Sequence, residues 1–204
     1  MPMNQIAYFH RLGKERDPAE FNRRYWEYGK GQPLDESAAK MIYAPIIEKV
    51  GSIFPDKDAL IGEIGCGTGD ILVCLRNMGY TNLIGLEKEE MPLRIARERG
   101  LDVHQMGHYD VRIAASAIKG NFSGLIANRV FETPVMNRDY AETMAKTAIK
   151  SLVPGGFAII GSTEKGRMHL YGFMKNGGVK LHSEADFPSE PYVRSLVVYE
   201  RYKL

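Results

Sequence analysis

The sequence has little of what marks several large classes of protein. It contains two cysteines, Cys66 and Cys74, which lie on one short segment and suggest neither a disulfide framework nor a zinc site. No apolar run approaches the length that spans a bilayer. The N-terminal stretch, MPMNQIAYFHRLGKER, lacks the apolar core of a signal peptide. We therefore expect a cytoplasmic protein with no membrane partner.

A strong excess of charge of one sign is also missing. The formal net charge is +2 at pH 7 and no concentrated basic region stands out, which argues against a nucleic-acid partner. Histidines, cysteines and carboxylates do not occur at the spacings of metal ligands, so no metal is expected. What remains is ordinary globular composition, 44% hydrophobic and 25% charged, in 204 residues. That length suits one domain with a small appendage.

The appendage is predicted at the N-terminus. Residues 1–34 are polar, rich in aromatic residues and interrupted by proline and glycine. We interpret them as an arm or cap, partly helical from Pro18 to Tyr28. Residues 35–204 carry regular patterns and form the predicted main domain.

Strands and helices alternate through most of the main domain. Apolar runs predict strands at 59–65, 82–87, 102–106, 123–131 and 155–162. Apolar residues at helical spacing predict helices at 35–50, 70–80, 89–100, 111–120 and 137–152. For the first of these helices, Asp35 is the expected N-cap, Pro45 the expected kink and Gly51 the expected end.

The last part of the chain breaks this alternation. A short helix is predicted in GRMHLYGFMKNGG (166–178), followed by two strands, 179–187 and 195–202, with no helix between them. The pattern predicts an α/β fold: a doubly wound, mostly parallel seven-stranded sheet with helices on both faces and an antiparallel C-terminal hairpin.

A glycine-rich turn follows the first predicted strand, in LIGEIGCGTGD (Leu60–Asp70). A purely structural strand-to-helix turn would also favour glycine, which takes positive φ and leaves room for close approach. The dinucleotide fingerprint G-x-G-x-x-G fails because its third position falls on Asp70, and the Gly-Lys-Ser/Thr of a P-loop is absent. The pattern acidic-x-Gly-x-Gly-x-Gly is matched in full, by Glu63, Gly65, Gly67 and Gly69.

This signature resembles that of the class I S-adenosylmethionine-dependent methyltransferases. Glu87 ends the second predicted strand, 22 positions after Gly65, where an acid suits hydrogen bonding to ribose hydroxyls. SLVPGGFAIIGS (151–162) resembles the family's fifth strand with its preceding turn, and SLVVYERY (195–202) its closing strand. The resemblance covers about residues 38–204.

The resemblance implies binding of S-adenosyl-L-methionine, with S-adenosyl-L-homocysteine as product. Glu63 would orient the ammonium group, directly or through water, or anchor the glycine turn by accepting backbone N–H bonds, and the two roles are compatible. Glu87 would bind the ribose, or alternatively cap a helix, and Lys88 or a neighbouring apolar side chain would flank the adenine. The implied cofactor-binding residues are Glu63, Gly65, Cys66, Gly67, Thr68, Gly69, Glu87, Lys88, Gly107, His108, Tyr109 and Asn128.

Two departures from the family pattern stand out. The acid that usually reads the adenine amine is displaced to Asp110, and Ser123-Gly124 replaces the Asp that commonly begins the fourth strand. The Asn-Pro-Pro-Tyr type of motif is absent, which argues against amino-methylation of DNA bases.

The catalytic and acceptor residues are less defined by the sequence. His169 and His108 are the candidate bases, although isolated histidines usually serve no catalytic role. Tyr25, Trp26 and Tyr28 in the arm would close over the site or simply pack on the core, and Arg129 follows the fourth strand where acceptors bind.

Three functions are compatible with these residues. The first is a methyltransferase that transfers a methyl group in line to an O, N or C nucleophile of a small molecule. The second is a protein or RNA methyltransferase, and the third is a non-catalytic S-adenosylmethionine-binding subunit. A homodimer remains possible under each.

Overall fold

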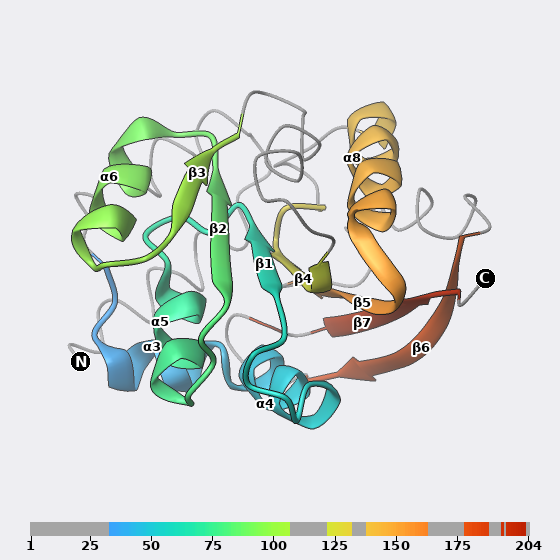
Figure 1. Ribbon diagram of the computed structural model, residues 1–204, viewed down its shortest axis with the longest axis horizontal. Helices are drawn as coiled ribbons and strands as arrows, with labels where there is room; N and C mark the ends of the chain where they lie inside the picture. The colour runs from blue at the N-terminus through green and yellow to red at the C-terminus, as the bar shows by residue number, and fades with distance from the viewer. Residues whose placement is uncertain are drawn as a thin grey trace.

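The computed structural model describes residues 33–106, 122–131, 138–162, 178–187, 193 and 195–202. They form a seven-stranded sheet with helices packed on it (Figure 1). The predicted arm up to residue 32, the predicted helix at 111–120 and all but the last residue of the predicted helix at 166–178 lie outside the described residues.

The strands follow the order β3-β2-β1-β4-β5-β7-β6 across the sheet. The pairs from β3 to β5 are parallel, whereas β7 pairs antiparallel with both β5 and β6. The predicted mixed sheet with an antiparallel C-terminal hairpin is therefore confirmed. The strands are β1 Ile61–Ile64, β2 Leu83–Glu87, β3 Val103–Gln105, β4 Phe122–Asn128, β5 Leu152–Ser162, β6 Val179–Asp186 and β7 Ser195–Arg201.

Helices cover both faces of this sheet (Figure 1). Alternate strand residues point to opposite faces, so Leu125 and Ala127 of β4 pack with helix α8 while Ile126 packs with α3, α4 and α5. Helix α6 packs on α5 and β3 through Leu93 and Ala96. The helices are α3 Glu36–Ile42, α4 Ala44–Ile53, α5 Asp70–Asn77, α6 Glu90–Glu98 and α8 Arg138–Ser151.

The first predicted helix is two helices in the structure. Asp35 is the N-cap of α3 as predicted, and its Oδ1 accepts the Ala38 N–H at 2.9 Å. The chain breaks at Tyr43, and Pro45 lies in the first turn of α4, where its missing N–H costs nothing. The predicted end at Gly51 is wrong because α4 continues to Ile53. It ends instead just before Pro55, which disfavours helical backbone in the residue preceding it.

The predicted Pro-Gly-Gly turn lies inside a strand. β5 begins at Leu152, and the pairing with β4 shifts register between Phe122 and Gly124. Gly155 has φ 80°, and a Cβ on Gly156 would lie 2.9 Å from the Ser123 carbonyl oxygen. The glycines thus form a bulge that lets β4 and β5 stay paired.

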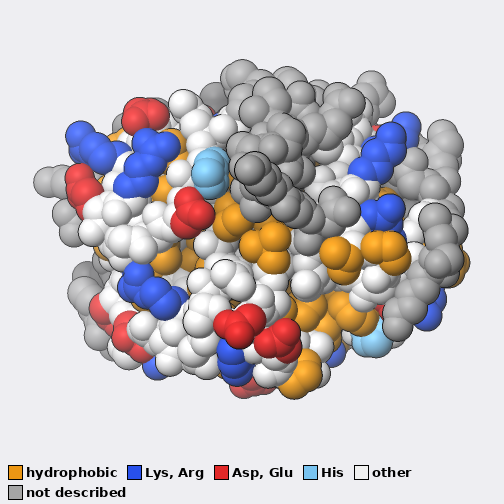
Figure 2. Space-filling model, in the orientation of Figure 1, with side chains coloured by type: hydrophobic (Ala, Val, Ile, Leu, Met, Phe, Trp, Pro, Cys, Tyr) orange, Lys and Arg blue, Asp and Glu red, His pale blue; other side chains and the backbone are white. Residues whose placement is uncertain are grey.

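Surface charge and helix apolarity bear on the kinds of partner the protein could have. On the face shown in Figure 2, Lys and Arg side chains are interspersed with Asp and Glu side chains. In the part of the chain that the structure describes, no helix combines the length and apolarity that a membrane crossing requires.

Candidate functional site

The candidate site lies where the strand order reverses. β1 and β4 are neighbours in the sheet. After β1 the chain continues to β2 on one side, whereas after β4 it continues to β5 on the other side. Ligands of open α/β sheets bind beyond the carboxyl ends of the strands at such a point. Gly65 after β1 and Val130 after β4 meet there, because a Cβ on Gly65 would lie 2.7 Å from Val130 Cγ2.

The three signature glycines all adopt left-handed backbone conformations. Their φ angles are 68° at Gly65, 54° at Gly67 and 79° at Gly69. A Cβ on Gly69 would also collide with Leu101. The Gly65 N–H donates to the Leu86 carbonyl at 2.7 Å, which ties the turn to β2. Any other residue would be strained at these positions, so the turn keeps a bare backbone.

Glu87 connects the end of β2 to this turn. Its Oε2 accepts the Gly67 N–H at 2.9 Å, and its Oε1 accepts the N–H groups of Lys88 and Glu89 at 2.7 and 2.9 Å. Burial raises the pKa of Glu87, and these N–H donors oppose that rise. The anchoring role considered for Glu63 thus belongs to Glu87, which also fixes the turn into α6.

Glu63 is a buried carboxylate at the end of β1. Its side chain is 3% exposed, and its Oε2 has no hydrogen-bond partner among the described residues. The pKa of Glu63 is raised well above its usual value, first by burial and then by the negative charges of Asp70 and Glu87. A buried acceptor of this kind is costly until a donor reaches it.

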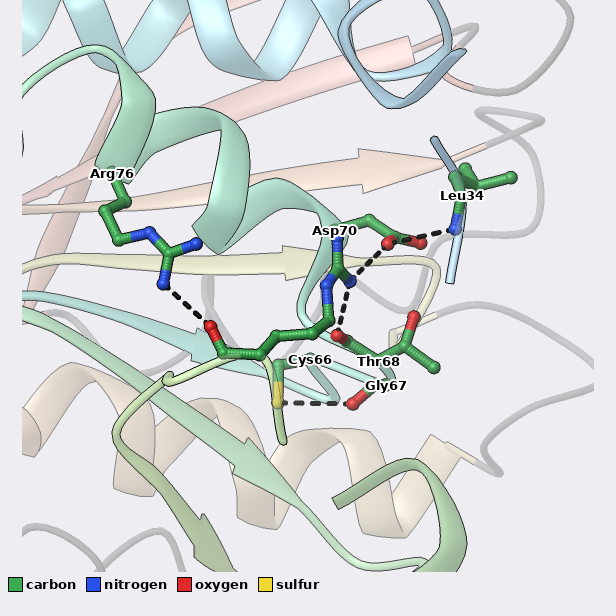
Figure 3. A network of polar contacts seen from close by, with 7 residues as sticks. Leu34, Cys66, Gly67, Thr68, Asp70 and Arg76 are labelled. Atoms are coloured by element: carbon green, nitrogen blue, oxygen red, sulfur yellow. Dashed lines mark hydrogen bonds and ion pairs between the residues drawn. The ribbon is translucent and has the colours of Figure 1, made fainter. Parts of the chain in front are cut away.

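A network that the sequence did not reveal joins the glycine turn to two distant segments (Figure 3). Asp70 Oδ1 accepts the Leu34 N–H at 3.2 Å and an Arg99 Nη1 donor at 2.6 Å. The same Nη1 donates to the Thr68 carbonyl at 2.6 Å. Burial raises the pKa of Asp70, and the Arg99 guanidinium opposes that rise. Asp70 follows the third glycine and Arg99 ends a predicted helix, but nothing in the sequence pairs them.

The exit from β4 brings Asn128 and Arg129 to the same edge of the sheet. Arg129 is buried at φ 63°, the left-handed conformation that is uncommon outside glycine, and its N–H donates to the Gly161 carbonyl at 2.8 Å. Asn128 Oδ1 has no hydrogen-bond partner among the described residues and lies against Gly161. Strained, buried polar groups of this kind concentrate at functional sites.

The remaining predicted residues fall into two groups. Cys66 is buried against Gly85, and burial raises the pKa of its thiol, whereas Lys88 is exposed and pairs with Glu89 at 3.2 Å. The described residues hold no group of His, Cys, Asp and Glu arranged for a metal ion. The predicted residues that lie outside the described part are Tyr25, Trp26, Tyr28, Gly107, His108, Tyr109 and His169.

The chain matches no protein-family profile and no curated protein by sequence, but it has matches among solved structures. Among solved structures, the amino pentose methyltransferase CalS10 from Micromonospora echinaspora, solved with S-adenosylmethionine bound, matches with a TM-score of 0.64 at 14% identity. The match covers 87% of this chain and 96% of that one.

A second match is the magnesium protoporphyrin IX methyltransferase from Synechocystis PCC 6803, also solved with S-adenosylmethionine bound. Its TM-score is 0.60 at 12% identity, over 81% of this chain and 79% of that one. The chain has the class I methyltransferase fold. A [4+2]-cyclase, SpnF, matches as well, with a TM-score of 0.62 at 13% identity over 78% of this chain and 80% of that one. At these identities the fold is shared, and the chemistry has to be argued from the site.

Proposed function

We propose that the protein is an S-adenosyl-L-methionine-dependent methyltransferase that acts on a small molecule. The observation that carries the proposal is the turn of three left-handed glycines at the reversal of the strand order. Glu87 anchors this turn by accepting a hydrogen bond from the Gly67 N–H. Such a turn presents backbone where a side chain would block a ligand.

The residues of the turn fit the proposed cofactor. Glu63 Oε2 is buried and lacks a donor among the described residues, and an ammonium group would supply one. Gly65 to Gly69, with Cys66 and Thr68 among them, would face the methionine and ribose portion. Glu87 keeps lone pairs for ribose hydroxyls beside its three N–H bonds, and Lys88 would lie by the adenine.

The chain's own task would be orientation. S-adenosyl-L-methionine supplies a methyl group already activated on a sulfonium centre. Holding an acceptor in line with that methyl group and keeping water out can lower the barrier by about 7–11 kcal/mol. Asn128 and Arg129 lie at the edge where an acceptor would approach. Where the acceptor must lose a proton, His169 or His108 is the proposed base.

The small-molecule assignment rests on the simple architecture of the described part of the chain. Its described residues form one sheet with its covering helices, which leaves no separate peptide-binding or nucleic-acid-binding module within that part. The similar structures are described as methyltransferases of an amino pentose and of magnesium protoporphyrin IX. The aromatic arm, with Tyr25, Trp26 and Tyr28, would cover the site in a cytoplasmic enzyme.

A second candidate is a cofactor-binding protein without methyl transfer. The structural similarity to a [4+2]-cyclase favours keeping it, because the same fold carries a protein described by a different reaction. A methyltransferase of protein or RNA would instead need a docking surface outside this core.

The test uses purified protein, methyl-labelled S-adenosyl-L-methionine and a lysate of the source cell, fractionated by size. We expect label in the small-molecule fraction, and loss of that label with the Glu87→Ala variant. Label in protein or RNA would contradict the small-molecule assignment. Binding of the cofactor with no label in any fraction would favour the non-catalytic candidate.

A further inference from the structure

Asp70 and Arg99 form a largely buried ion pair beside the glycine turn. Their side chains are 11% and 18% exposed, and Arg99 Nη1 lies 2.6 Å from Asp70 Oδ1. Asp70 is the first residue of α5, directly after Gly69, and Arg99 is the C-cap of α6. The pair therefore bridges the turn to a helix 29 residues away in the sequence.

The same pair holds the backbone on both sides of Gly69. Arg99 Nη1 donates to the Thr68 carbonyl, and the Arg99 carbonyl accepts a hydrogen bond from Arg76 Nη1 at 2.9 Å, which holds the end of α6 against α5. Figure 3 shows Asp70 directed toward Leu34, with Thr68 two residues earlier in the turn. Three segments, the turn, the end of α6 and the residue before Asp35, thus converge on one carboxylate.

A buried ion pair contributes more to the positioning of its neighbours than to the stability of the fold. Removing two charges from water costs about as much as their attraction returns, so such a pair adds little net stability over well-packed apolar residues. What a guanidinium adds is direction, because its planar donors meet acceptors only in fixed geometry. Here a single nitrogen fixes both a carboxylate and the Thr68 carbonyl.

We propose that Arg99 and Asp70 are positioning residues that set the Thr68–Asp70 half of the glycine turn for the amino-acid end of the cofactor. This inference rests on the proposed function. Neither residue needs to touch the cofactor, because Arg99 acts through the Thr68 carbonyl and Asp70 through the start of α5.

The experiment compares Arg99→Gln with Arg94→Gln in the full-length protein. Arg94 is the matched control, because it lies on the same helix in an exposed pair with Glu98 at 3.8 Å. Affinities for S-adenosyl-L-homocysteine and for 5′-methylthioadenosine, which lacks the amino-acid end, are measured by titration well below each variant's melting temperature. Arg99→Gln should weaken the affinity for S-adenosyl-L-homocysteine by roughly fivefold or more. It should weaken the affinity for 5′-methylthioadenosine by less than about twofold. Arg94→Gln should change neither affinity by more than about twofold.

The outcomes separate the two proposals. If the unaltered protein binds no S-adenosyl-L-homocysteine, the proposed function fails and this inference falls with it. If it binds but Arg99→Gln lowers only the melting temperature, or weakens both ligands equally, the pair is structural and the inference is overturned. Should Arg99→Gln not fold, Asp70→Asn replaces it, since the amide keeps the side chain's shape, and the same difference between ligands is required.

Discussion

The side chain of Glu87 accepts a hydrogen bond from the N–H of Gly67 at 2.9 Å, although the two residues lie 20 positions apart in the sequence. This contact joins the end of β2 to the middle of the glycine turn. It means that the acid proposed for ribose binding also holds the backbone proposed to lie under the rest of the cofactor. Changes at Glu87 should therefore affect both parts of the site.

Replacing Glu87 by Gln should weaken binding of S-adenosyl-L-homocysteine by tenfold or more, about 1.4 kcal/mol. The two carboxylate oxygens of Glu87 accept hydrogen bonds from three N–H donors. The Gln amide has the same size but lacks the charge and one of these two acceptor oxygens. Isothermal titration measures the affinity. Glu98→Gln, in the exposed pair with Arg94, is the control and should bind normally. Equal affinity in both variants would remove Glu87 from the site.

Two glycines separate backbone strain from damage to the site. Gly67 and Gly79 have φ angles of 54° and 93°, so Ala at either should cost about 1–2 kcal/mol of unfolding free energy. Gly79 follows Met78, the C-cap of α5, and a Cβ there meets nothing within 4 Å. Urea unfolding should show similar losses, whereas titration should show weaker cofactor binding only for Gly67→Ala. Normal binding by a folded Gly67→Ala protein would contradict the proposed contact.

Glu63 should make the ligand-free protein less stable as pH rises. Its folded pKa lies well above the usual 4.5, so the folded state holds a proton that the unfolded state has released. Its contribution to stability is complete below about pH 4.5 and is lost as pH rises through the raised pKa. Glu63→Gln should therefore gain more stability over the unaltered protein at about pH 8 than at about pH 5, by urea unfolding. The same gain at both pH values would show that Glu63 titrates normally.

Tyr80→Phe should destabilise the fold without affecting the site. The Tyr80 hydroxyl is buried and donates to the Phe54 carbonyl at 2.7 Å, at the end of α4. Its loss leaves that carbonyl unsatisfied, at a cost of about 1–3 kcal/mol. Thermal unfolding should show the loss, and titration with S-adenosyl-L-homocysteine should show unchanged affinity. A change in affinity would place α4 in contact with the site.

Local patterns were sufficient to predict most of the described fold. The strand before Gly65 and the helix after Gly69 follow from apolar periodicity and from glycine at the turn, all within a few residues. The glycine signature and the spacing of Glu87 predict the cofactor site, and the structure brings the two together, with the Gly67 N–H bonded to Glu87.

Features that depend on packing were not predictable. Gly51 was expected to stop a helix, but it is not among the glycines with positive φ, and α4 continues through it to Ile53. Gly155 and Gly156 were expected to form a turn, but the approach of β4 turns them into a bulge within β5. The pair of Asp70 and Arg99 depends on how α5 and α6 pack, which no short-range pattern contains.

Titration of the unaltered full-length protein with S-adenosyl-L-homocysteine, with NADH as the competing dinucleotide, tests the proposed site most directly. We predict saturable binding of S-adenosyl-L-homocysteine at one site per chain and no binding of NADH, because Asp70 occupies the third glycine position of the dinucleotide fingerprint. Binding of NADH in place of S-adenosyl-L-homocysteine, or binding of neither, would contradict the assignment of the glycine turn to this cofactor.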